Sequence, residues 1–158
     1  MLTTHNDSWS IVWYAVPSKT GAPTMLTHKE ATMEIVRRDY PDLPQPAGAF
    51  HHSVRWGNLL FIAGSTARGT PAERGDIAGQ TEAIIQKFQH ILEANGGSLE
   101  NVVKVTSFVT DLREAPASAE VRRKYFAGAF PASTQVQVAA LGTPDLKIEI
   151  EAIAVLPD

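Results

Sequence analysis

Hydrophobic and polar positions follow a regular pattern only from about residue 50 onward. Two short apolar runs, residues 50–55 and 58–63, are separated by a Trp-Gly pair, and Gly57 followed by asparagine can supply the positive φ of a tight hairpin. Between Asp76 and Gly96, apolar side chains recur mostly at three- and four-residue spacing, which predicts a helix with Asp76 as its N-cap. The regular part of the chain therefore begins with a hairpin followed by a helix.

The second half of the chain continues this alternation. We expect a strand, a helix and two further strands, in residues 102–110, 115–126, 134–139 and 147–156. In the last strand the even-numbered residues are apolar and fall on one face, whereas Glu149 and Glu151 fall on the other. The order β-β-α-β-α-β-β predicts an α+β fold with two helices on one face of a sheet. The second face needs another cover, and oligomerisation is the simplest one.

Residues 1–45 lack a persistent helical or strand period and are punctuated by prolines. We therefore expect a partly irregular N-terminal extension before a domain at residues 46–158. Two interpretations of the extension stay open. The biological start could lie at Met25 or Met33, or the extension could be an ordered arm that packs on a neighbouring subunit. The second follows from three aromatic side chains within the first 15 residues, which would be costly to leave in water.

Composition narrows the class of protein. A length of 158 residues with 44% hydrophobic residues suits a single domain with its own core. The absence of cysteine excludes disulfides and thiolate chemistry and fits a cytoplasmic location. A net charge of −3 offers no basic surface for nucleic acid. The apolar stretch at residues 11–16 is far shorter than the roughly 20 residues of a membrane-spanning helix. We expect neither nucleic acid nor membrane as a partner.

The segment FPASTQVQVAALGTPDLKIEIEAIAV, residues 130–155, resembles the C-terminal signature of the RidA/YjgF reactive-intermediate deaminases. That signature typically has P-A-R-S/T, then an alternating strand, an A-x-L turn and E-I-E-A-I-A. Further matches, including the Ala63-Gly64 turn, extend the resemblance over about two-thirds of the chain. One position departs from it, because Ser133 stands where the family has its substrate-binding arginine.

The resemblance implies a chorismate-mutase-like fold that assembles as a barrel-like homotrimer, with ligand sites in the clefts between subunits. It also implies hydrolysis of short-lived enamines and imines of 2-oxo acids, with release of ammonia. Glu149 takes the position of the family's water-orienting carboxylate, and Gly64 belongs to the turn that lines the pocket. We expect no metal and no cofactor, because one acceptor for water and donors that fix the substrate suffice for this reaction.

Further candidates for contact with the substrate come from the same resemblance. Ser133, Thr134 and Gln135 could line the pocket as polar groups. The turn from Gly64 through Ser65 to Arg68 is similar to that of the aminomuconate deaminase branch, which also carries a Phe and a His near the positions of Phe50 and His52. Phe50 stands where the wider family commonly has Tyr.

Each of these candidates has a structural alternative. Arg68 could be an arginine on a solvated loop, and His52 could bond a neighbouring backbone. For Glu149 the alternative is a salt bridge across a subunit interface, to Lys147 or Arg122. No G-x-S-x-G turn or Ser-His-Asp arrangement supports a serine hydrolase.

The missing arginine changes the expected chemistry. Loss of a buried charged pairing costs on the order of 2–5 kcal/mol, so the usual 2-imino acids should be handled poorly unless another cation, with Arg68 the best candidate, reaches the cleft. We expect an imine- or enamine-hydrolysing enzyme with a non-standard substrate. The alternative is a non-catalytic relative that binds a small metabolite or regulates a partner at the intersubunit cleft. Ribonuclease activity, suggested for some relatives, is disfavoured by the acidic charge balance.

Overall fold

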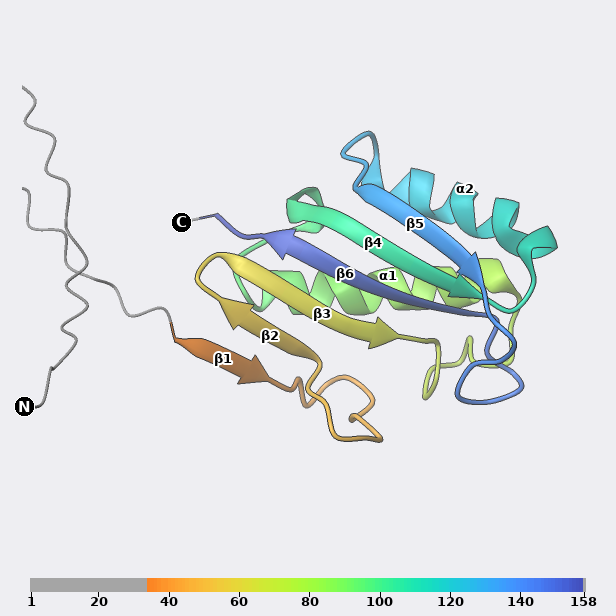
Figure 1. The fold of residues 1–158 in the computed structure, drawn as a ribbon, viewed down its shortest axis with the longest axis horizontal. Helices are drawn as coiled ribbons and strands as arrows, with labels where there is room; N and C mark the ends of the chain where they lie inside the picture. Colours follow the sequence, from red (N-terminus) through yellow and green to blue (C-terminus); the bar gives the residue numbers. More distant parts are fainter. Residues whose placement is uncertain (1–33, 158) are drawn as a thin grey trace, which may run out of the picture. The chain divides into compact units, whose positions relative to one another are not determined.

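The computed structural model describes residues 34–157, which form a six-stranded mixed sheet and two α-helices (Figure 1). The strands are β1 (Ile35–Arg38), β2 (Ser53–Trp56), β3 (Leu59–Ser65), β4 (Val102–Val109), β5 (Ala132–Gln137) and β6 (Ile148–Val155). The helices are α1 (Ile77–Glu93) and α2 (Ala115–Phe126), and the 3-10 turns η1 (Leu99–Asn101) and η2 (Leu112–Glu114) precede β4 and α2. The strand order is β1-β2-β3-β6-β4-β5, and only β4 and β5 are parallel.

The α+β fold and the predicted order of elements from β2 to β6 are confirmed. The hairpin turn has Gly57 at a φ of 59°, as the Gly-Asn pair indicated. The fifth strand begins at Ala132, two residues earlier than predicted. β1 is an additional strand, which pairs antiparallel with β2 and lies inside the segment 1–45 that we expected to be a partly irregular extension. The rest of that segment, residues 1–33, lies outside the described residues.

Both helices pack on one face of the sheet and form the core with it. α1 begins as predicted, because the Asp76 carboxylate accepts a hydrogen bond of 2.8 Å from the Gly79 N–H. Its apolar side chains join the even-numbered residues of β6, from Ile148 to Ala154, in the buried core. α2 forms the crossover that the parallel pair β4–β5 requires, and it packs against α1. No helix among residues 34–157 has both the length and the apolarity to cross a membrane.

The opposite face of the sheet, which we call the open face, carries an exposed apolar surface. The strand register places four large hydrophobic side chains on it: Ile35, Trp56, Phe61 and Val136, which are 51%, 44%, 42% and 41% exposed. Side chains alternate between the two faces of a strand, so these residues share a face with Glu149 and Glu151 of β6. An apolar surface spread over four strands is typical of an interface between proteins.

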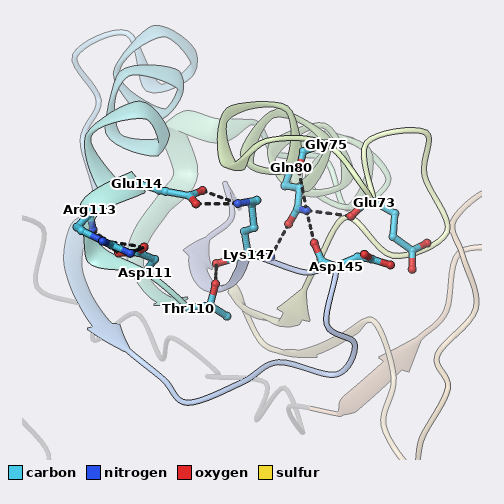
Figure 2. Close-up of polar contacts among 9 residues, drawn as sticks. All are labelled: Glu73, Gly75, Gln80, Thr110, Asp111, Arg113, Glu114, Asp145 and Lys147. Atoms are coloured by element: carbon cyan, nitrogen blue, oxygen red, sulfur yellow. Dashed lines mark hydrogen bonds and ion pairs between the residues drawn. The ribbon is translucent and has the colours of Figure 1, made fainter.

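The start of β6 is held in place by a buried hydrogen-bond network around Gln80 of α1 (Figure 2). The Gln80 amide group donates to the carbonyls of Glu73 (2.9 Å) and Asp145 (2.8 Å), and its oxygen accepts from the Lys147 N–H (2.8 Å). The Lys147 ammonium donates to both carboxylate oxygens of Glu114, at 2.7 and 2.9 Å. The backbone two residues before Glu149 is therefore tied to α1 and to the start of α2.

Candidate active site

The Glu149 carboxylate lies against the backbone of Gly64 on the open face. β3 pairs with β6 at Ile62↔Ala152 and again at Ser65↔Ile150, so β3 carries one extra residue between these pairs and forms a β-bulge there. A Cβ atom on Gly64 would collide with Oε1 of Glu149. The glycine, which lies within the bulge, therefore provides the space in which this carboxylate sits.

Glu149 is half-buried, and its carboxylate forms no hydrogen bond or ion pair with the other described residues. Burial raises the pKa of Glu149 above its usual value, and the nearby charge of Glu151 raises it further. Within the described part of the chain Glu149 bonds neither Lys147, which pairs with Glu114, nor Arg122, which donates one hydrogen bond to Ser133 but has no ion pair. The salt bridge across a subunit interface stays an alternative for Glu149. An unpaired carboxylate with a raised pKa is a suitable acceptor for a proton from water.

Substitution of Gly64 by alanine tests this arrangement. Gly64 is not among the positive-φ residues, so the added methyl group acts through space and not through backbone strain. It would displace the Glu149 carboxylate, and we expect the rate of any reaction that uses this carboxylate to fall by about 10²-fold with little loss of thermal stability. Gly142→Ala is the matched control, because its Cβ would meet no atom of residues 34–157 within 4 Å. Equal rates for the two variants would contradict the assigned role of Gly64.

A second cluster lies on the helix-covered side of the sheet, around Ser133. In the parallel register Ser133 pairs with Val105, whose side chain is buried under the helices. Arg122 of α2 donates a hydrogen bond of 3.2 Å from Nη1 to Ser133 Oγ. Burial lowers the pKa of Arg122, but an arginine keeps its charge in proteins. The Arg122 Nε is buried and has no hydrogen-bond partner in the described part of the chain.

A cavity of about 320 Å³ opens beside this arginine. It is lined by Val105, Ala119, Arg122, Arg123, Phe126, Phe130, Pro131 and Ser133. Among residues 34–157, two arginines and no carboxylate line the cavity, and five of the remaining six lining residues are apolar. The cavity is therefore suited to an anion with an apolar body.

The three polar residues predicted after the proline do not lie on one face. Ser133 and Gln135 point to the helix side, and the Gln135 amide nitrogen is buried with no partner among residues 34–157. Thr134 lies on the open face, where its hydroxyl accepts a hydrogen bond of 2.7 Å from the Lys104 ammonium. The predicted segment therefore contributes to two different surfaces.

The remaining candidates for contact with the substrate lie in or next to the loops that follow β1 and β3. Both ring nitrogens of His52 are bonded to backbone: Nδ1 accepts from the Tyr40 N–H (3.2 Å), and Nε2 donates to the Pro44 carbonyl (3.0 Å). The structure thus shows the backbone-bonding alternative for His52, and both ring nitrogens are engaged within residues 34–157. Phe50, 49% exposed, lies just before β2. The ligand contacts predicted for His52 and Phe50 stay predictions.

Ser65 and Arg68 lie at and beyond the end of β3. The Ser65 hydroxyl donates to the Ala63 carbonyl within the bulge, at 3.1 Å. Arg68 is exposed; its backbone carbonyl accepts from the Lys87 ammonium, and its guanidinium makes no ion pair within residues 34–157. The cation next to Ser133 is Arg122, which the sequence suggested only as a partner for Glu149. The sequence feature that could have indicated a cation at this place is the Arg122-Arg123 pair, on a helix that ends shortly before Pro131.

These features define a small α+β domain with an unpaired, half-buried carboxylate on one sheet face and an arginine-lined cavity on the other. A sequence profile of the endoribonuclease L-PSP family matches residues 41–156, more than half of the chain. The chain belongs to this family, the RidA/YjgF family that its C-terminal segment resembles.

Individual relatives agree with this assignment. A RutC family protein of Pyrococcus horikoshii is 39% identical over 114 residues, which cover 70% of this chain and 90% of that protein. The 2-iminobutanoate/2-iminopropanoate deaminase of Dermatophagoides farinae is 30% identical over 119 residues, which cover 73% of this chain and 92% of the deaminase. The crystal structure of a yeast protein has a TM-score of 0.72 at 33% identity, and the match covers 78% of this chain and all of the yeast protein.

Proposed function

We propose that this protein hydrolyses reactive imines and enamines, releasing ammonia, with Glu149 as the residue that orients and deprotonates water. The observation that carries the proposal is the unpaired Glu149 carboxylate in the space left by Gly64. The deaminase of Dermatophagoides farinae, 30% identical, supports this reaction class. The net charge of −3 does not favour nucleic acid as a partner, and no helix among residues 34–157 is long and apolar enough to cross a membrane. We propose a cytoplasmic enzyme.

The proposed reaction requires one proton acceptor and no cofactor. Water adds to the carbon of the protonated C=N bond while Glu149 accepts one water proton, which gives a carbinolamine. Glu149 then returns the proton to the amine nitrogen, the C–N bond breaks with its electron pair on nitrogen, and ammonia leaves. The hydroxyl oxygen forms the carbonyl of the product as its proton is released. An enamine enters the same sequence after protonation of its β-carbon.

We propose that the enzyme acts as a homotrimer with its sites between subunits. Glu149 points to the open face, whereas Ser133 and Arg122 lie on the helix side of the same sheet. Because opposite faces of a sheet cannot both contact one small substrate, residues of both clusters can meet only if neighbouring chains share the site. The exposed apolar residues of the open face support association of copies of this chain.

The direct test is ammonia release from 2-iminobutanoate and 2-iminopropanoate generated in situ, measured against the uncatalysed rate. Acceleration by the wild-type protein supports the hydrolase. A second candidate, a non-catalytic protein that binds a metabolite, is favoured by one observation, the serine at position 133 in place of arginine. Stabilisation of the protein by 2-oxo acids without turnover of any imine would support this second candidate.

The pH dependence of the rate provides a separate test. The pKa of Glu149 is raised, first by burial and then by Glu151, so protonation inactivates this carboxylate at a higher pH than for an exposed glutamate. We expect the rate to fall about tenfold per pH unit on the acid side, with a midpoint above the usual value of 4.5. Glu151→Gln removes the second cause and should move the midpoint to lower pH. A rate that stays constant down to pH 4 would exclude Glu149 as the proton acceptor.

A further inference from the structure

We propose that Arg122 of α2 binds the carboxylate of the substrate, in place of the arginine that the family carries at position 133, and that the apolar cavity beside it holds a bulky apolar side chain. This inference concerns the substrate class of the proposed hydrolase and rests on that function for its chemistry. The ligand class that follows is a 2-imino or 2-oxo acid with a branched or aromatic side chain.

α2 is the crossover between the parallel strands β4 and β5, and the crossover brings Arg122 over β5. Its Nη1 atom lies 3.2 Å from Ser133 Oγ. A guanidinium from the helix therefore reaches the residue from which the family's arginine would extend. The short serine side chain leaves room for it and holds it by one hydrogen bond.

Arg122 is half-buried, yet it has no ion pair within residues 34–157, and its Nε is buried without a partner. Removing a charge from water without a partner is unfavourable. Arg123 adds a second positive charge to the cavity lining, and no acidic residue of the described part of the chain lines the cavity to balance it. A ligand carboxylate would supply the missing partner and can accept two parallel hydrogen bonds from a guanidinium.

The size and polarity of the cavity suit a bulky apolar side chain. Its volume of about 320 Å³ is at the lower end of the range for small-molecule sites. Apart from the arginines and Ser133, its lining is apolar, and Phe126 and Phe130 supply two aromatic rings. Such a lining stabilises an apolar side chain and offers nothing to a polar one. The smallest 2-imino acids would leave much of the cavity unfilled.

The test is a binding measurement without turnover, by calorimetry. The ligand is 4-methyl-2-oxopentanoate, and its neutral counterpart is 4-methylpentan-2-one, which has a methyl group in place of the carboxylate. For the wild-type protein we expect the acid to bind at least tenfold more tightly than the ketone. Arg122→Met should weaken binding of the acid by about 30-fold or more and leave binding of the ketone unchanged. Lys124→Met is the matched control, because it removes one positive charge from the same helix outside the cavity lining, and it should bind like wild type.

Two further variants cover the case in which Arg122→Met does not fold. Arg122→Lys keeps the positive charge but loses the planar guanidinium that can donate two parallel hydrogen bonds, so we expect an intermediate loss of affinity for the acid. The exchange variant Arg122→Met/Ser133→Arg places a guanidinium at position 133 of β5 instead of position 122 of α2. It should recover most of the affinity for the acid. Wild-type affinity for the acid in Arg122→Met or Arg122→Lys, or no binding of the acid by wild type, would overturn the inference. Failure of ammonia release alone would instead count against the proposed hydrolysis, because binding is measured without any reaction.

Discussion

Glu149→Gln is expected to lower the catalysed rate of ammonia release by about 10²–10⁴-fold and to leave the fold unchanged. Glutamine has nearly the same shape as glutamate, but its amide oxygen is a far weaker proton acceptor. The carboxylate has no hydrogen bond or ion pair with the other described residues, so its replacement by an amide of the same shape breaks no polar contact in that part of the chain. Steady-state ammonia release, corrected for spontaneous hydrolysis of the imine, measures the loss.

The raised pKa of Glu149 also predicts how the thermal stability of the same variant differs from wild type. A carboxyl group whose pKa is raised in the folded protein favours folding while it is protonated, and this contribution is lost as the pH rises through the folded pKa. Relative to wild type, Glu149→Gln should therefore gain thermal stability between acidic and neutral pH. A variant that loses both activity and stability at neutral pH would indicate a structural role for Glu149.

Glu151→Gln is the matched control for the rate. Glu151 lies two residues along the same strand, on the same face, and is more exposed than Glu149. Its carboxylate does not lie over Gly64, so we expect less than about a threefold change in the maximal rate. Equal losses in the two variants would show that the rate depends on the negative charge of the open face and not on the position of one carboxylate.

The sequence predicted the face of Glu149 correctly because strand alternation is a local property. Four apolar residues at even positions of β6 require the odd positions to lie on the other side, whatever the rest of the fold does. The helix that begins at Ile77 could also be predicted from the sequence, because a capping aspartate and the spacing of its apolar residues specify it locally. β1 was missed because its four residues, IVRR, are too short for a strand period and lie among prolines.

The second half of the site could not be predicted, because it depends on a contact between distant elements. Nothing in the helical pattern of α2 indicates that Arg122 is the residue that reaches Ser133; this follows from how the crossover lies over β5. The similarity of its turn to that of one branch of the family favours Arg68 as the cation of the cleft. The sequence of a short turn does not determine where the guanidinium of a long arginine side chain lies. His52 was favoured on the same kind of similarity, and the backbone groups of Tyr40 and Pro44 that bond it come from an irregular segment with no pattern to analyse.

Phe61→Glu is expected to convert the proposed homotrimer into monomers of 17.1 kDa. Phe61 lies on the open face of β3, opposite Ile153, within the exposed apolar surface. A carboxylate buried there between subunits would have no partner, and an unpaired buried charge costs several kcal/mol. Each subunit interface would carry this cost, so the association constant should fall by several orders of magnitude. Light scattering coupled to size-exclusion chromatography measures the mass.

Leu112→Glu is the matched control, because Leu112 is 49% exposed, similar to Phe61, but lies in η2 outside the strands of the open face. It should assemble as wild type does. A wild-type protein that is monomeric at micromolar concentration, or a Phe61→Glu variant that keeps the wild-type mass, would contradict an interface on the open face. The monomeric variant should also lose ammonia release although it keeps Glu149, Ser133 and Arg122. One chain presents these groups on opposite sides of its sheet, and only a neighbouring subunit can bring the cavity of one chain to the carboxylate of another.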